Sequence, residues 1–269
     1  MEINAINPSE AVALAGKLTR SLGAKVMPRG LECREVVAVT MVIERPWQLP
    51  LVVPGREMRD FISAAEIIGL LGQTALDAVI MKKCQSLYSF TDRGVMFGAY
   101  GTRIRGQWSM VLDELRKDHD SRRAVMTIYD GRSDLGRDVK DIPCTLSFQF
   151  LIRDDKLNMI TTMRSNDVYR GLPYDLMQFG ALLCATAQVL GLQPGTYYHR
   201  VGSFHLYETD VPHVNRIHQT VPRYMPYVPL FSFDDEEYIT IWCQQAQHPE
   251  PTLVATPFEE FLLTAIREG

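Results

Sequence analysis

Apolar residues recur at helical spacing in four stretches of the chain. Residues 56–83 carry them three or four positions apart, which predicts a helix with a break at Gly72. Residues 173–190 are strongly apolar and have a proline in the first turn, where the missing backbone N–H costs little. Shorter helices are predicted at 110–117 and from about 257 to 266.

Strands are predicted where β-branched residues cluster or where apolar and polar residues alternate. Residues 35–44 are rich in valine and isoleucine. Four further strands are predicted at 124–129, 145–152, 157–163 and 197–207. Helices and strands therefore mix without a regular alternation, which predicts the α+β class.

Three connections between these elements have recognisable signals. The triplet Arg153-Asp154-Asp155 predicts a hairpin turn between two of the strands. The proline-containing residues 47–55 predict an irregular connection. The glycine-rich, basic residues 98–106 predict a loop.

Composition is that of an ordinary globular protein. Of the 269 residues, 46% are hydrophobic and 22% are charged, which is enough apolar material for a large core. The length suits one large domain or two small ones, and we expect a single domain over residues 1–269. The net charge of −4 argues against wholesale binding to nucleic acid or to an anionic membrane, but it permits a pocket for one phosphate.

The cysteines and the first residues favour a cytoplasmic protein. The five cysteines are odd in number and form no CxxC pair, which argues against a disulfide framework and against a zinc site. They are Cys33, Cys84, Cys144, Cys184 and Cys243. Residues 1–10 contain no basic segment followed by an apolar run, so we expect no secretory signal, and no stretch is long and apolar enough to cross a bilayer.

Three places carry side chains suited to chemistry. Cys144 follows a proline at the start of a predicted strand, where a cation can activate a thiol, although most free cysteines are packing residues. Residues 163–175 place an arginine, a hydroxyl group and carboxylates before a helix N-terminus, which suits either an anion or a capping loop. His205 and Tyr207 share one face of a strand, where they could hold a sugar hydroxyl or form a satisfied core pair.

Taken in order, these places resemble the thymidylate synthase family. The resemblance covers roughly residues 66–210, and Glu66 lies in a helix similar to the one that bears the family's catalytic glutamate. The matching motifs are residues 118–123, Tyr100-Gly101, Pro143-Cys144-Thr145, Gln149-Phe150, Arg164-Ser165-Asn166-Asp167, Gly171-Leu172-Pro173-Tyr174-Asp175 and His205-Leu206-Tyr207. The family's fold implies a mixed β-sheet packed with helices and a homodimer formed through the sheet.

The resemblance implies catalytic roles for four residues. Cys144 would attack C6 of a pyrimidine nucleotide, so that C5 can attack the one-carbon unit of 5,10-methylenetetrahydrofolate. Glu66 would order water for proton transfer, and Tyr100 would help to remove the C5 proton. Asp175 would contact the base.

The remaining matches imply binding roles. Arg164 would bind phosphate and help to hold Cys144 as a thiolate, while Arg122 and Arg123 would reach the phosphate site of the neighbouring subunit. The full set implied for the nucleoside monophosphate is Arg29, Arg122, Arg123, Gln149, Arg164, Ser165, Asp167, Asp175, His205 and Tyr207. The set implied for the folate is Tyr88, Asp167, Gly171 and Tyr174.

Asp175 determines which base is predicted. Synthases acting on deoxyuridylate have asparagine here, whose amide complements the O4 acceptor and N3 donor of uracil. Cytosine presents the reverse pattern, and a carboxyl group can accept from its amino group and share a proton with N3. With aspartate at this position, the chain resembles the deoxycytidylate hydroxymethylase branch of the family, which carries aspartate there. The alternative is that Asp175 only favours the first turn of its helix through the helix dipole.

Other departures from the family concern the product. Thr145 replaces the histidine that usually follows the nucleophile, residues 85–92 contain Leu87, Tyr88 and Phe90 but no tryptophan, and the sequence does not end in an aliphatic residue. A less sealed site would let water capture the exocyclic methylene, giving a hydroxymethyl product. We therefore predict a deoxycytidylate 5-hydroxymethylase. Three alternatives stay open: a cytidylate hydroxymethylase, a methylase acting on deoxyuridylate, and a nucleotide- or RNA-binding protein without catalysis.

Overall fold

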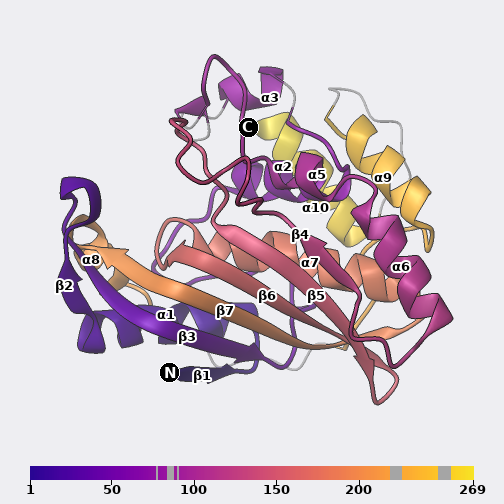
Figure 1. Cartoon of the computed structure of the whole chain (residues 1–269), viewed down its shortest axis with the longest axis horizontal. Coiled ribbons are helices and arrows are strands. Elements are labelled where there is room, and N and C mark those ends of the chain that lie inside the picture. Colours follow the sequence, from indigo (N-terminus) through magenta and orange to yellow (C-terminus); the bar gives the residue numbers. More distant parts are fainter. Residues whose placement is uncertain (77, 84–87, 90, 219–225, 248–255) are drawn as a thin grey trace.

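A mixed seven-stranded sheet forms the centre of the fold (Figure 1). The computed structural model describes residues 1–76, 78–83, 88–89, 91–218, 226–247 and 256–269. Its strands are β1 (Glu2–Ala5), β2 (Ala24–Val26), β3 (Cys33–Ile43), β4 (Val125–Thr127), β5 (Thr145–Arg153), β6 (Lys156–Asp167) and β7 (Gln193–Tyr207). The strand order is β1-β3-β7-β6-β5-β4, with β2 paired to β3. The pairs β1–β3 and β6–β7 are parallel, and the other pairs are antiparallel.

Helices cover one face of the sheet. In Figure 1, α1 and α7 lie behind the strands, while α2, α5, α9 and α10 form a layer above the sheet. The helix bounds are α1 (Pro8–Leu22), α2 (Asp60–Leu71), α3 (Ala78–Lys83), α5 (Tyr100–Ile104), α6 (Gln107–Lys117), α7 (Leu172–Val189), α8 (Val211–Val214), α9 (Glu236–Gln245) and α10 (Pro257–Glu268). Single 3₁₀ turns occupy η1 (Pro28–Gly30) and η2 (Glu208–Asp210). No helix of the described residues is long and apolar enough to span a bilayer.

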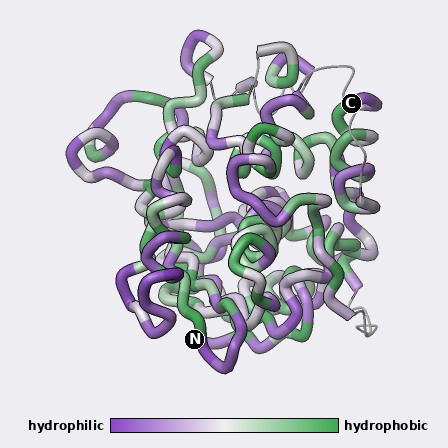
Figure 2. The backbone as a smooth tube through the Cα atoms, turned by 90° about the vertical axis from the view of Figure 1, so that its right-hand side faces the viewer, coloured by the Kyte–Doolittle hydropathy of each residue, from purple (hydrophilic) through white to green (hydrophobic). Residues whose placement is uncertain are grey.

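The core lies between the sheet and α7. Alternate residues of β6, including Leu157, Met159 and Met163, are buried on the helix side, as expected for a strand with one face packed. Helix α7 is buried on nearly all sides because it packs against β6 and β7 as well as against α1 and α2. Hydrophilic stretches gather in the peripheral turns and loops (Figure 2).

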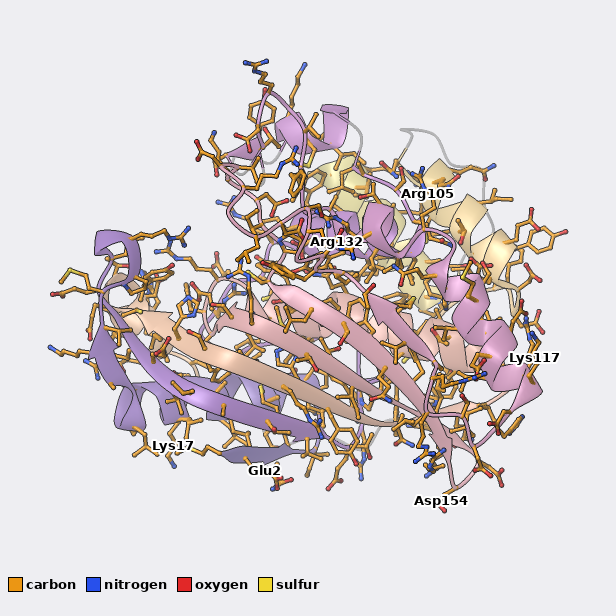
Figure 3. All side chains as sticks on the ribbon, in the orientation of Figure 1. Glu2, Lys17, Arg105, Lys117, Arg132 and Asp154 are labelled. Atoms are coloured by element: carbon orange, nitrogen blue, oxygen red, sulfur yellow. The ribbon has the colours of Figure 1, made fainter. Side chains whose placement is uncertain are left out.

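The predicted strands and helices are found with small shifts of their ends. The break at Gly72 is confirmed, since α2 ends at Leu71 and the next helix starts at Ala78. The hairpin between β5 and β6 is confirmed too, with Asp154 and Asp155 both at positive φ, as a tight two-residue turn requires. Figure 3 shows Asp154 at the outer tip of this hairpin.

The predicted loop at 98–106 is wrong, because α5 occupies Tyr100–Ile104. Glycine favoured a loop in the sequence, but Gly101 serves close packing. A Cβ at Gly101 would collide with the backbone of Gly69 and Thr74, so the missing side chain lets α5 approach the end of α2. Helix α1, which was not predicted, begins with Asn7, whose side chain accepts from the backbone N–H of Glu10.

Trp108 joins α6 to α7 and should contribute strongly to stability. Its side chain is fully buried, and its indole Nε1 donates to Thr186 Oγ1 at 3.0 Å. We expect Trp108→Ala to lower the free energy of unfolding by about 3–5 kcal/mol, through lost contacts and a cavity. Met110 on the same helix is 72% exposed, so Met110→Ala should change that free energy by about 0.5 kcal/mol or less. Urea titrations of both variants measure the difference, and equal losses would contradict this packing.

Candidate active site

Cys144 stands immediately before β5, half-buried and packed against the core. Arg164, on the neighbouring strand β6, forms hydrogen bonds with three successive residues that end at Cys144. Its backbone N–H donates to the carbonyl oxygen of Cys144 at 2.8 Å. Its guanidinium donates from Nε to the carbonyl oxygen of Pro143 and from Nη2 to that of Ile142, each at 2.9 Å. The sheet register therefore fixes the Arg164 guanidinium against the segment that carries Cys144.

The charges around the thiol oppose one another. Burial raises the pKa of Cys144, and the carboxylates of Asp175 and Asp141 raise it further, while the positive charges of Arg164 and Arg29 lower it. Burial dominates, so the pKa lies above the ordinary value of a cysteine. Arg164 thus favours the thiolate but does not by itself hold Cys144 as one.

Two carboxyl groups with raised pKa values are linked through one amide. Burial raises the pKa of Glu66 on α2 to about 8 and that of Asp175 on α7 to about 7. Gln178 Nε2 donates to Asp175 Oδ1 at 3.2 Å and lies 3.4 Å from Glu66 Oε2. Both groups can therefore carry a proton near neutral pH, which is the state that general acid–base chemistry needs.

Asp141 is a third acid in this cluster, and the sequence reasoning missed it. Its Oδ2 accepts from the backbone N–H of Gly98 at 2.9 Å, and its charge raises the pKa of both Glu66 and Cys144. Burial also raises the pKa of Asp141 itself. Its position three residues before the nucleophile was the available signal.

Tyr100 begins α5 and faces the same cluster. Burial raises the pKa of its phenol well above the ordinary value, and Asp175 and Cys144 raise it further, so the phenol stays neutral. Its ring stacks on Phe179 of α7, with ring centroids 6.1 Å apart. The structure therefore brings together the four residues assigned to catalysis, from α2, α5, α7 and the start of β5.

Ser165, His205 and Tyr207 form a second polar group along β6 and β7. Ser165 Oγ lies 3.3 Å from His205 Nδ1. The rings of His205 and Tyr207 meet edge to face with centroids 5.2 Å apart, and the Arg170 guanidinium lies over the Tyr207 ring at 5.0 Å. The predicted sharing of one face by His205 and Tyr207 is consistent with this contact.

The turn before α7 positions Asp167 and Asp175. Asp167 Oδ1 accepts from the backbone N–H groups of Tyr169 and Arg170, both at 2.8 Å, so this oxygen serves the turn. Gly171 follows, where a Cβ would come within 3.3 Å of Asn166 Nδ2 and 3.5 Å of Asp175 Oδ2. Glycine therefore leaves room beside the buried carboxyl group.

Aromatic rings and arginines gather beside Tyr174. The Arg56 guanidinium lies over the rings of Tyr169 and Tyr174 at 4.9 and 5.2 Å, and the backbone N–H of Arg59 donates to the Tyr174 hydroxyl. Ile62 packs with Tyr174. The sequence reasoning did not select Arg56, although it follows a Pro-Gly turn close to the start of α2.

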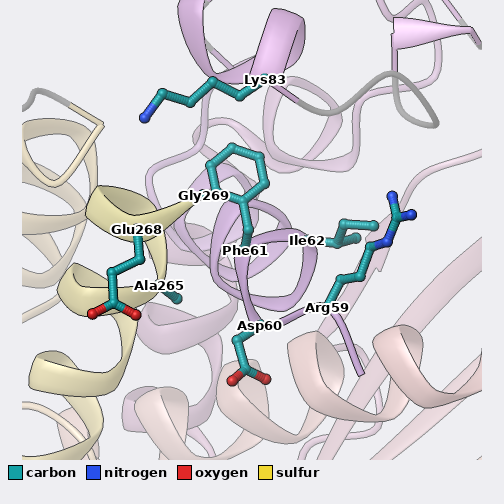
Figure 4. A pocket seen from close by; sticks show the side chains of 8 residues that line it. All are labelled: Arg59, Asp60, Phe61, Ile62, Lys83, Ala265, Glu268 and Gly269. Atoms are coloured by element: carbon teal, nitrogen blue, oxygen red, sulfur yellow. The ribbon is translucent and has the colours of Figure 1, made fainter. Parts of the chain in front are cut away.

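A pocket of about 300 Å³ lies where the start of α2 meets the end of α10 (Figure 4). It combines apolar and charged side chains. The lining residues are Arg59, Asp60, Phe61, Ile62, Lys83, Ala265, Glu268 and Gly269. Cys144 is not among them, so the pocket lies beside α2, the helix that carries Glu66, and does not enclose the Cys144 thiol.

Three predicted residues lie near strand β4, at the edge of the sheet. Gln149 alternates with the buried Phe148 and Phe150, so it faces away from the core, and its Nε2 donates to the carbonyl oxygen of Arg122. Arg123 forms a two-pronged ion pair with Glu114 within the same chain. Contacts between these residues and Cys144 are not seen among the described residues.

Arg29 and Tyr88 have less defined surroundings. Arg29 sits in the η1 turn with φ of 53°, and its charge lowers the pKa of Cys144. The Tyr88 side chain is 36% exposed. Leu87 and Phe90, which were noted because no tryptophan accompanies them, lie outside the described residues.

Replacing Arg164 should make the thiol less reactive. In Arg164→Gln the positive charge is lost, so the pKa of Cys144 rises and a smaller fraction is thiolate at a given pH. We expect the rate of alkylation at Cys144 by iodoacetamide at pH 8 to fall roughly threefold to tenfold. Mass spectrometry of the Cys144 peptide measures the rate, with the exposed Arg116→Gln as control. Equal rates in both variants would show that Arg164 does not act on the thiol.

Residues 74–245 match the family described as thymidylate synthase. A deoxyuridylate hydroxymethyltransferase of Bacillus phage SP01 is 31% identical over 206 residues, which cover 70% of this chain and 54% of that protein. One of Pseudomonas phage M6 is 33% identical over 63% of this chain and 51% of its own length. A thymidylate synthase of Phytoplasma mali is 27% identical over 52% and 48%. The chain thus spans about half the length of the curated relatives it matches. Because the family model matches more than half of the chain and the sheet is mixed, the chain belongs to the thymidylate synthase family.

Proposed function

We propose that the chain is a folate-dependent 5-hydroxymethylase of a pyrimidine 2′-deoxynucleoside 5′-monophosphate. The observation that carries this proposal is the thiol of Cys144 held beside the Arg164 guanidinium and facing Asp175, with Glu66 linked to Asp175 through Gln178. A nucleophile, a cation for the phosphate and two titrating acids in one place are what addition to C6 and proton removal from C5 require.

Each step of the proposed reaction can be assigned to Cys144 or to a residue near it. The Cys144 sulfur forms a bond to C6, and the electron pair of the C5–C6 double bond moves toward C5. C5 then bonds to the one-carbon unit, and a base removes the C5 proton. Glu66 can take that proton, because its pKa of about 8 lets it exchange a proton near neutral pH. The neutral phenol of Tyr100 can orient the water that carries it. Loss of that proton would let the amine nitrogen of the folate leave from the one-carbon unit, and water would add to the carbon that remains. The electron pair then returns to re-form the C5–C6 double bond as the Cys144 sulfur leaves.

The folate fits beside α2. When bound, 5,10-methylenetetrahydrofolate supplies a carbon at the oxidation level of formaldehyde. Tyr174 and the Arg56 guanidinium offer a stacking surface, and the pocket beyond Ile62 adds the apolar Phe61 and the cationic Lys83. Aromatic and apolar walls suit a ring system, and Arg59 and Lys83, which line the pocket together with Asp60 and Glu268, suit the carboxylates that end it. Water added to the methylene carbon balances the reaction, giving the 5-hydroxymethyl nucleotide and tetrahydrofolate.

Deoxycytidylate is the substrate that we favour. Asp175 is 8% exposed and has a pKa of about 7, so a single proton can be shared between its carboxyl group and N3 of cytosine. Its oxygens already accept from Asn166 and Gln178, which leaves lone pairs for the amino group of the base.

Deoxyuridylate is the second candidate, because two relatives carry the name deoxyuridylate hydroxymethyltransferase. A protonated carboxyl group can also pair with uracil, donating to O4 and accepting from N3–H. A proton on the carboxyl oxygen that faces N3 therefore suits cytosine, and a proton on the oxygen that faces position 4 suits uracil.

We further propose that two copies pair through the open face of the sheet, with Arg122 and Arg123 reaching the partner's phosphate. Among the described residues no helix lies over the sheet face that Figure 1 turns toward the viewer, and Arg122 and Arg123 precede β4 at its edge. Arg123 would have to exchange its pairing with Glu114 for a phosphate. Sedimentation equilibrium measures the mass, and a monomer at micromolar concentration would contradict the pairing.

Incubation with methylenetetrahydrofolate and either deoxycytidylate or deoxyuridylate tests the function. Mass spectrometry of the nucleotide separates hydroxymethyl from methyl products, and absorbance separates tetrahydrofolate from dihydrofolate. A 5-methyl product with dihydrofolate would overturn the water-capture step. Cytidylate is included to test the sugar, and tritium release from C5 of labelled nucleotide tests whether any catalysis occurs.

A further inference from the structure

A chain of buried hydrogen bonds leads from β7 through β6 to Asp175. The Tyr197 hydroxyl lies 2.8 Å from His199 Nδ1, and His199 Nε2 lies 2.9 Å from Asn166 Oδ1. Asn166 Nδ2 then donates to Asp175 Oδ2 at 2.7 Å. Tyr197 and His199 are two residues apart on one face of β7, so the strand alternation aims both side chains at the core.

Every member of this chain is buried. The exposed fractions are 1% for Tyr197, 0% for His199, 3% for Asn166 and 8% for Asp175. Burial lowers the pKa of His199 to about 3, so the imidazole is neutral and has one donor and one acceptor nitrogen. In so buried a position water does not pair with a donor that lacks its acceptor, so an unpaired donor costs free energy. The direction of each hydrogen bond therefore matters.

The carboxylate at the end of the chain sets that direction. An ionised Asp175 only accepts, so the Asn166 amide must turn Nδ2 toward it and Oδ1 toward His199. His199 Nε2 must then carry the proton, which leaves Nδ1 to accept from the Tyr197 hydroxyl. Conversely, His199 with its proton on Nε2 opposes turning of the amide, because a reversed amide would place two donors against each other there. A reversed amide would place its oxygen against Asp175 Oδ2, where two acceptors repel.

We propose that Tyr197 and His199 are positioning residues that act through Asn166 to keep Asp175 Oδ2 an acceptor and thereby set the base selectivity of the site. The inference rests on the proposed function in one respect, that Asp175 contacts the base. With Oδ2 held by the Asn166 donor, the proton that Asp175 shares with the base is favoured on Oδ1. One fixed donor and one fixed acceptor then face the base edge, and only one of cytosine and uracil fits both.

Variants of His199 separate positioning from packing. His199→Leu fills the space but removes the donor to Asn166, whereas His199→Gln keeps an N–H donor at a similar reach. The test measures dissociation constants of dCMP and dUMP without folate, and kcat/KM for both with folate. We expect His199→Leu to weaken binding of the preferred nucleotide about 10- to 100-fold and to bring the dCMP:dUMP ratio toward one. His199→Gln should keep the ratio within about fivefold of the wild type.

Tyr197→Phe supplies a milder change with almost the same volume. It removes the hydroxyl that donates to His199 Nδ1, and we expect the same direction of change at about threefold to tenfold. Tyr238→Phe is the matched control, since Tyr238 lies exposed on α9. Binding of deoxyribose 5-phosphate, which lacks a base, should be unchanged in all four variants.

The outcomes distinguish the inference from the proposed function. If His199→Leu lowers stability but leaves the dCMP:dUMP ratio of dissociation constants at the wild-type value, the network only packs and the inference is overturned. If the wild type turns over neither nucleotide but His199→Leu still changes that ratio, the inference holds and the proposed reaction fails. If the wild type binds neither nucleotide, both are overturned.

Discussion

Cys144→Ser should abolish turnover while leaving the nucleotide site intact. A serine hydroxyl has a far higher pKa than a thiol and is a poorer nucleophile toward C6, and the carboxylates of Asp175 and Asp141 oppose its ionisation. We expect kcat to fall by at least about 10⁴-fold, the scale seen when a covalent nucleophile is removed. Single-turnover assays with each nucleotide and methylenetetrahydrofolate measure the loss, and tritium release from C5 shows whether C6 addition still occurs.

The control is a cysteine of the same chain that lies away from the cluster. Cys184 is buried in α7, and burial alone raises the pKa of its thiol far above the ordinary value, so Cys184→Ala should keep kcat within about threefold. Binding of the nucleotide to Cys144→Ser should stay close to that of the wild type, because Arg164, Ser165 and His205 are unchanged. Turnover by Cys144→Ser within tenfold of the wild type would remove Cys144 from the mechanism.

Asp175→Asn should reverse the preference between cytosine and uracil. The amide cannot share a proton with N3 of cytosine, but it complements the N3 donor and O4 acceptor of uracil. The new amide oxygen would stay with the Asn166 donor, and its N–H₂ would force Gln178 to turn its own amide. A buried mismatch costs about 1–3 kcal/mol for each unpaired group, so we expect the ratio of kcat/KM values for dCMP and dUMP to fall about 10²- to 10³-fold.

A carboxylate that does not face the base provides the comparison. Asp167→Asn alters an acid in the neighbouring turn, where Oδ1 accepts two backbone N–H groups, and it should lower activity on both nucleotides by the same factor. An unchanged dCMP:dUMP ratio in Asp175→Asn, or the same change in Asp167→Asn, would refute the role assigned to Asp175.

The sequence predicted the strands of the site better than its contacts. Short-range patterns revealed β5, β6 and α7, and the ordered motifs selected Cys144, Arg164 and Asp175, because periodicity and spacing are local properties. Asp141 and Arg56 escaped notice because their relevance comes only from where the chain folds, beside Gly98 and over Tyr174.

Gly101 of α5 shows a second limit of what a sequence pattern can reveal. Gly101 indicated flexibility in a linear view, whereas its lack of a side chain allows helix-to-helix contact. His199 was likewise indistinguishable from an ordinary core histidine. Its hydrogen-bond partner Asn166 sits on the neighbouring strand, where the register places it opposite Phe204, so only the folded side chains reveal the contact.

The sheet order also has a kinetic consequence. The β5–β6 hairpin joins residues that are close in sequence, so the nucleophile and its arginine can meet early during folding. Strand β7, which carries His205 and Tyr207, is held on its other side by β3 from the first part of the chain, with Cys33 opposite Tyr207. The entropy of closing that long loop must be overcome before His205 and Tyr207, which we propose hold the ribose, take their places. The two ends of the proposed site are therefore expected to mature at different times, and a nascent chain would hold Cys144 beside Arg164 before it could hold a sugar.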